Sequence, residues 1–190
     1  MASSSLPWTG LWKTIWGLIP SPETGGHILV VLDDSIITRV GKKIFGCEKI
    51  FDHAAKSNQS KYPWAQNIVS VGLLKQVKGR RACLFLDFRF YLPLKTIQAK
   101  KKTATIKGEV VSFQTKMTQA GQMLIEIAEH FSIVPILAVT DSWFGNNGLW
   151  KPVYEAIGNR FNILSRLRCN NVLYDLPEKR KPKQRGRNKK

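Results

Sequence analysis

Residues 135–148, PILAVTDSWFGNNG, decide the fold, because an apolar and β-branched run leads straight into a carboxylate and then a glycine-rich turn. A run without polar alternation is typical of a central strand covered on both faces, as when helices flank a sheet. Asp141 would end that strand, at the edge where open α/β sheets collect ligand-binding and catalytic groups. The alternative is that Asp141 caps a following helix over residues 149–157, since Asp is a common N-cap residue.

A second segment repeats this arrangement. Residues 27–35, HILVVLDDS, place Asp33 and Asp34 after an apolar run. If the two strands are neighbours in one sheet, Asp34 and Asp141 lie side by side, and paired carboxylates bind hard cations such as Mg²⁺. An ordinary turn at residues 33–35 is the alternative.

Composition indicates one packed domain with a polyanionic partner. The chain has 190 residues, 43% of them hydrophobic, and a formal net charge of +17. Such an excess of positive charge favours nucleic acid as the partner, although any single charge cluster can be merely a solvated face. The three cysteines and three histidines are scattered without metal-ligand spacing. They therefore indicate neither a zinc site nor a disulfide framework, and a reducing cytoplasm is the expected compartment.

The N-terminal twenty residues carry an apolar stretch that is too short to span a bilayer and lacks the basic start of a signal peptide. Trp8, Trp12 and Trp16 recur every four residues, which predicts one stripe on a helix. This stripe either packs on the chain's own sheet or belongs to a longer helical region, and we favour the second interpretation.

The predicted elements follow an informative order. A strand over residues 27–34 and a polar excursion over 38–60 precede an antiparallel hairpin, 65–74 with 81–92. An exposed lysine-rich loop follows, and then a helix over 117–131, the strand ending at Asp141, a helix over 149–157, and short strands over 161–164 and 171–174. This is the ribonuclease H-like order, in which the first and fourth strands are adjacent and parallel. That order would bring Asp34 and Asp141 together as a metal-binding pair.

Five segments carry a family likeness: ILVVLDDS, KKIFGCEKIFDHAAKSNQSKYPWAQNIVSVGLL, FRFYLPL, ILAVTDSWFGN and LSRLRCNNVLYDLP. In this linear order, from about residue 11 onward, the chain resembles the DDE transposases of bacterial insertion sequences. The resemblance implies an α/β fold, a ribonuclease H-like mixed sheet with flanking helices. It also implies metal-dependent DNA cleavage and strand transfer at transposon ends by two Asp and one Glu. Asp34, preceded by the acid Asp33, matches the first aspartate and Asp141 the second, and the intact enzyme would use two Mg²⁺ or Mn²⁺ ions.

The sequence departs from this pattern at the third acid, a glutamate on a later helix. Glu155 lies in the helix directly after the strand and is carried away from the carboxylates, whereas Asp175 and Glu178 flank a proline-bearing exit. We therefore expect a fragment or decayed copy, incomplete at its C-terminal end, with weak or no cleavage activity alone. The expected organisation is a helical segment over 1–26, a partial catalytic core over 27–176 and a basic disordered tail over 177–190.

DNA, as transposon ends and target, is the expected partner, and no membrane is involved. The predicted DNA contacts are basic residues of the lysine-rich loop, the last strand and the tail: Lys100, Lys101, Lys102, Arg166, Arg168, Lys179, Arg180 and Lys181. Trp143 either stacks on a displaced base or belongs to the core. The resemblance is compatible with a homodimer and with a cytoplasmic, nucleoid-associated protein. The competing hypotheses are a non-catalytic basic nucleic-acid-binding protein and another ribonuclease H-like nuclease, such as a junction resolvase.

Overall fold

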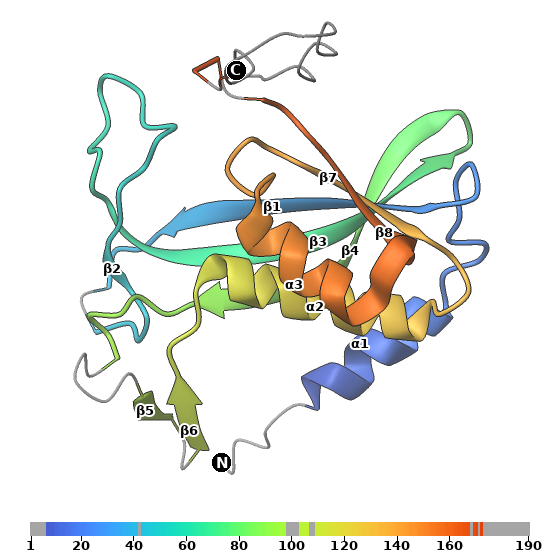
Figure 1. The fold of residues 1–190 in the computed structure, drawn as a ribbon. Coiled ribbons are helices and arrows are strands. Elements are labelled where there is room, and N and C mark those ends of the chain that lie inside the picture. The colour runs from blue at the N-terminus through green and yellow to red at the C-terminus, as the bar shows by residue number, and fades with distance from the viewer. Residues whose placement is uncertain are drawn as a thin grey trace, which may run out of the picture.

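The computed structural model describes residues 7–41, 43–97, 103–106, 109–167, 169–170 and 172. The elements along the chain are α1 (Trp8–Gly17), β1 (Ile28–Thr38), β2 (Glu48–Lys49), β3 (Trp64–Val77), β4 (Arg80–Tyr91), β5 (Thr103–Ile106), β6 (Glu109–Ser112), α2 (Lys116–His130), β7 (Ile136–Thr140), α3 (Asn147–Ile157), a 3₁₀ turn (Gly158–Arg160) and β8 (Phe161–Ser165). Figure 1 shows them as one mixed sheet with three helices and a small separate hairpin.

The main sheet has the predicted strand order and directions. Strand β1 pairs in parallel with β7 and antiparallel with β3, β7 pairs in parallel with β8, and β4 pairs antiparallel with β3. Lys78 and Gly79 join β3 to β4 with positive φ angles of 49° and 75°, as a two-residue type I′ turn requires. The prediction that the first and fourth long strands are adjacent and parallel is therefore confirmed.

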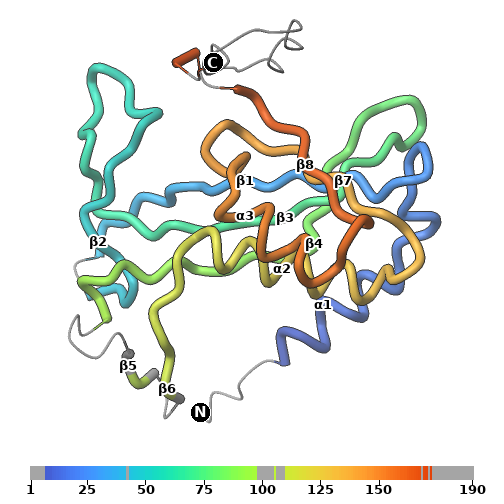
Figure 2. The backbone as a smooth tube through the Cα atoms, viewed as in Figure 1, coloured from blue at the N-terminus to red at the C-terminus, as the bar shows by residue number. Residues whose placement is uncertain are grey.

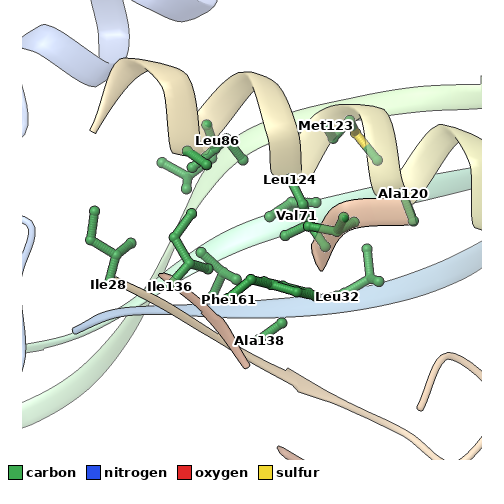
Figure 3. Close-up of a cluster of buried hydrophobic side chains, with 14 of the residues drawn as sticks. Ile28, Leu32, Val71, Leu86, Ala120, Met123, Leu124, Ile136, Ala138 and Phe161 are labelled. Carbon is green, nitrogen blue, oxygen red and sulfur yellow. The ribbon is translucent and has the colours of Figure 1, made fainter. Parts of the chain in front are cut away.

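Helices α1, α2 and α3 all contribute to one core, on the face of the sheet that Ile28 and Leu32 share by strand alternation. Figure 3 shows side chains of α2, such as Leu124, packed toward β1 and toward Phe161 of β8. Each fully buried side chain of this size stabilises the fold by about 1.5–3 kcal/mol. On the opposite face of β7, Leu137 and Val139 are only half-buried. Cover on both faces, which the apolar run predicts, is thus not found within the described residues.

The tryptophan stripe of α1 packs on the chain's own sheet. The Trp16 indole is buried and donates a hydrogen bond of 2.7 Å from Nε1 to the carbonyl of Leu86 in β4. Trp8 and Trp12 contact the edge of the Phe88 ring. The interpretation that favoured a longer helical region is therefore wrong as an account of this stripe. No helix in the described ranges has the length and apolar character needed to cross a membrane.

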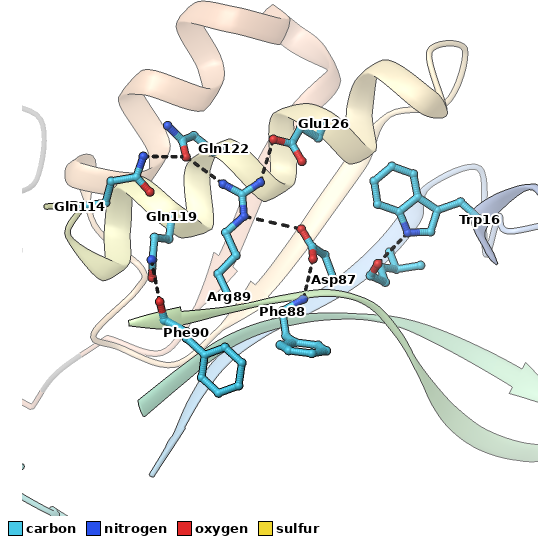
Figure 4. A network of polar contacts seen from close by, with 10 residues as sticks. Trp16, Asp87, Phe88, Arg89, Phe90, Gln114, Gln119, Gln122 and Glu126 are labelled. Carbon is cyan, nitrogen blue, oxygen red and sulfur yellow. Dashed lines mark hydrogen bonds and ion pairs between the residues drawn. The ribbon is translucent and has the colours of Figure 1, made fainter. Parts of the chain in front are cut away.

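A polar network ties α2 to the edge strand β4 (Figure 4). The Arg89 guanidinium donates to Gln122 Oε1 at 2.8 Å and to Glu126 Oε1 at 2.7 Å, and its Nε lies 3.7 Å from Asp87 Oδ2. Asp87 Oδ1 accepts a hydrogen bond of 2.7 Å from the amide of Phe88. Burial raises the pKa of Asp87 to about 6, although Arg89 and the Phe88 amide act to lower it. A charged cluster therefore lies under α2 on this side of the sheet.

The segments between the strands differ from the prediction in two places. Part of the expected lysine-rich loop is strand β5, which pairs with β6 in a two-stranded sheet. Such pairing satisfies backbone groups, which a count of charged residues does not reveal. The excursion between β1 and β3 includes β2, and Figure 2 shows the rest of it extending away from the sheet. The strand predicted over residues 171–174 lies almost wholly outside the described residues.

Candidate active site

The register between β1 and β7 positions the acids. Leu32 and Thr140 are the last pair of this parallel ladder, so Asp33 on β1 and Asp141, the first residue after β7, come directly after it, and Asp34 follows Asp33. The prediction that β1 ends at Asp34 is wrong, because its other edge continues to pair with β3 as far as Thr38. Asp34 therefore remains rigidly held by β3 beyond the point at which pairing with β7 stops.

Asp34 lies on the helix-covered face, with its side chain 26% exposed. Its Oδ2 accepts a hydrogen bond of 2.7 Å from Nδ2 of the fully buried Asn67 on β3. The same oxygen lies 2.6 Å from Nζ of Lys116, the first residue of α2. Asn67 and Lys116 are functional candidates that the sequence did not reveal.

Asp141 is held by its own loop. Its Oδ1 accepts hydrogen bonds of 3.0 Å from the amides of both Trp143 and Phe144, while Asn146, not Asp141, caps α3 through the amide of Gly148. The helix-cap interpretation of Asp141 is therefore wrong. Asp141 is exposed, and in the described part of the chain no hydrogen bond to its Oδ2 is found.

Close contact with Ser165 of β8 fixes the position of the loop that follows β7. Ser165 at the end of β8 donates a hydrogen bond of 2.8 Å from Oγ to the carbonyl of Asp141. Gly145 packs so tightly against Ser165 that a Cβ at this position would overlap the serine side chain. Glycine is thus required for the loop to return against β8.

Asp33 lies within the electrostatic influence of both Asp34 and Asp141. It alternates with Asp34 along β1 and is exposed, and its Oδ1 accepts a hydrogen bond of 2.8 Å from the Asp34 amide. Partial burial raises the pKa of Asp33, the amide lowers it, and the negative charges of Asp34 and Asp141 raise it further. Asp141 therefore lies near enough to Asp33 for its charge to act on that carboxyl group.

Aromatic rings line the approach to Asp34. The Lys116 ammonium lies 5.4 Å from the Tyr91 ring centroid and 5.7 Å from that of Trp143. Trp143 is 40% exposed, whereas its neighbour Phe144 is fully buried. The core interpretation of Trp143 is therefore wrong, because Phe144 takes the core position and leaves the indole at the surface beside Lys116.

Of the eight predicted DNA contacts, one, Arg166, lies within the described residues. Arg166 is exposed and follows Ser165, which pairs with Thr140, so it takes the position beside Asp141 on the neighbouring strand. The other predicted contacts lie outside the described residues: Lys100, Lys101, Lys102, Arg168, Lys179, Arg180 and Lys181.

The donor set fits a hard divalent cation in type, because Asp34 and Asp141 offer carboxylate oxygens and Mg²⁺ is usually held by one or two carboxylates plus substrate phosphates. The number of donors is small. Among the described residues no group of three His, Cys, Asp or Glu side chains is placed to hold a metal ion. Glu155 is exposed on α3 beside Lys151, at 3.8 Å, and Asp175 and Glu178 lie outside the described ranges.

Comparison with known families agrees with this geometry. A family model described as DDE superfamily endonuclease matches residues 2–190. The chain belongs to this family. The mixed sheet is accordingly ribonuclease H-like, as the sequence predicts, and the endonuclease family implies divalent-metal chemistry on DNA. Neither a curated protein nor a solved structure gives a significant match.

Proposed function

We propose that the chain is the catalytic region of an insertion-sequence transposase, which cleaves and joins DNA strands at transposon ends. The observation that supports this most is the parallel pairing of β1 with β7, which ends at Leu32 and Thr140, directly before the acids Asp33 and Asp34 on one strand and Asp141 after the other. Two parallel strands that carry acids to one sheet edge offer a rigid site for a cation and a phosphate. Membership of the endonuclease family gives the class of reaction.

In this proposal Asp34 and Asp141 are the catalytic metal ligands, for Mg²⁺ or Mn²⁺, with two ions in a complete site. Bound divalent ions would neutralise the scissile phosphate and activate the attacking hydroxyl. Asn67 orients the Asp34 carboxylate, and the amides of the loop after β7 orient Asp141. Arg166, beside Asp141, would contact a DNA phosphate.

A third acid is still needed for full activity in this family pattern. With only two aspartates assigned, we expect weak or no Mg²⁺-dependent nicking of supercoiled plasmid by this chain alone. Strong nicking that disappears in both Asp34→Asn and Asp141→Asn would contradict this expectation and would mean that the chain supplies another ligand. The basic tail and the lysine-rich segment would bind DNA in the cytoplasm, as part of a nucleoid-associated homodimer.

The competing function is a basic nucleic-acid-binding module, which the net charge of +17 favours. Duplex DNA affinity, measured by fluorescence anisotropy at fixed salt with Mg²⁺ or EDTA, separates the two. We expect Mg²⁺ to strengthen binding, and the gain to be lost in Asp34→Asn and in Asp141→Asn. Asp52→Asn is the matched control, because Asp52 lies in the segment between β2 and β3, where it accepts a hydrogen bond from the Ala54 amide. Equal binding with and without Mg²⁺ in all variants would instead indicate the module.

A further inference from the structure

The Lys116 ammonium compensates the negative charge of the Asp34 carboxylate when no metal ion is bound. It lies 2.6 Å from Asp34 Oδ2, and the two side chains are 20% and 26% exposed. Oδ2 also accepts the Asn67 hydrogen bond, so both of its acceptor positions are in use. A divalent ion can bind this oxygen only if Lys116 leaves it.

The location of Lys116 in its helix indicates that the ammonium serves Asp34 and not the helix. Lys116 is the first residue of α2, after the N-cap Thr115, and the first turn of α2 contains no acid. A cation next to the positive end of the helix dipole is unfavourable. The pairing with Asp34, which lies 82 residues away in the chain, offsets this penalty.

Two aromatic rings beside Lys116 offer its ammonium an alternative binding position. The rings of Tyr91 and Trp143 lie within 6 Å of Nζ, the range in which aromatic faces attract a cation. A short movement of the flexible lysine stem therefore releases Asp34 without moving the charge into an apolar environment.

We propose that Lys116 is a placeholder cation, which fills the divalent-cation position at Asp34 in the metal-free protein and sets the metal affinity of the site. This inference depends on the proposed function, because it takes Asp34 as a metal ligand. Removal of the ammonium eliminates the competitor and should tighten metal binding. For a partly exposed ion pair we expect a gain of about 2- to 5-fold.

The test is Mn²⁺ binding to the full-length chain without DNA, measured from the electron paramagnetic resonance signal of free Mn²⁺. Lys116→Met should lower the dissociation constant about 2- to 5-fold, and Lys116→Arg, which keeps the cation, should change it little. Lys151→Met is the matched control for net charge, because Lys151 is exposed on α3 and pairs there with the exposed Glu155. Circular dichroism of each variant confirms that it is folded.

Asp34→Asn distinguishes a failure of the proposed metal site from a failure of the placeholder role of Lys116. If Asp34→Asn leaves Mn²⁺ binding unchanged, the proposed metal site itself is wrong. If Asp34→Asn weakens binding but Lys116→Met fails to tighten it beyond Lys151→Met, the placeholder role is overturned and the site stands. In the double variant Asp34→Asn/Lys116→Met, the placeholder role requires that the gain from Lys116→Met disappear.

Discussion

Two acids of the main sheet, Asp87 and Asp34, each lie beside a basic side chain, but the two basic side chains are held differently. Asp87 on the edge strand β4 is 6% exposed, and its partner Arg89 also donates to Gln122 and Glu126 of α2 (Figure 4). Asp34 on the central strand β1 is 26% exposed, and its partner is the ammonium of Lys116.

The difference separates a structural cluster from an exchangeable one. The planar guanidinium of Arg89 makes several fixed bonds at once and joins β4 to α2, so its loss would leave a buried charge behind. The Lys116 ammonium is a compact charge on a flexible stem, held by one carboxylate oxygen and by aromatic rings. We infer that the β4 cluster stabilises the fold, whereas the β1 site is arranged for cation exchange.

The largest effect on stability is expected from Arg89→Met. Removal of the guanidinium leaves Asp87 buried without its cation, and we expect a loss of about 3 kcal/mol in the free energy of unfolding at pH 7. Urea denaturation measures this quantity. Arg166→Met, which removes the same charge from an exposed position, is the control and should cost little. A loss below about 1 kcal/mol for Arg89→Met would show that the β4 cluster is not structural.

The pH dependence of stability tests the buried carboxyl of the same cluster. Since the folded pKa of Asp87 is raised from 3.8 to about 6, its contribution to stability is complete below about pH 4 and is lost as the pH rises through about 6. The wild-type chain should therefore lose about 2 kcal/mol more than Asp87→Asn between pH 4.5 and pH 7. Parallel urea titrations at the two pH values measure the difference. Identical pH profiles for the two proteins would contradict the raised pKa.

The smallest effect on stability is expected from Lys116→Met. The pair with Asp34 is partly exposed, so we expect a change of less than about 1 kcal/mol in the free energy of unfolding. Chemical denaturation of Lys116→Met and Arg89→Met under the same conditions compares the two sites directly. A loss as large as that of Arg89→Met would mean that Lys116 is structural as well.

Local patterns predicted much of the sheet. The apolar run before Asp141, the repeat of that pattern before Asp34 and the hairpin gave the strand order that the structure confirms. They did so because buried strands and turns leave short-range signals. Strand ends were less predictable, since β1 continues past Asp34 only through its pairing with β3.

The partners of the acids could not be predicted in the same way. Lys116 and Asn67 reach Asp34 from positions far along the chain, and nothing in their neighbouring residues indicates this contact. The choice of Phe144 over Trp143 as the core residue likewise depends on how the loop after β7 returns against β8. Such contacts are set by tertiary packing, which residue periodicity does not encode.

The most direct test of the central claim is to locate a bound metal along the chain. With Fe²⁺ in place of Mg²⁺, ascorbate and peroxide generate radicals that cut the backbone beside the metal, and mass spectrometry identifies the cuts. We predict cuts near Asp34 and near Asp141 in the same sample, suppressed by excess Mg²⁺ and absent in Asp34→Asn. Cuts near Asp87 and Glu126, or none that Mg²⁺ suppresses, would contradict a metal site between β1 and β7.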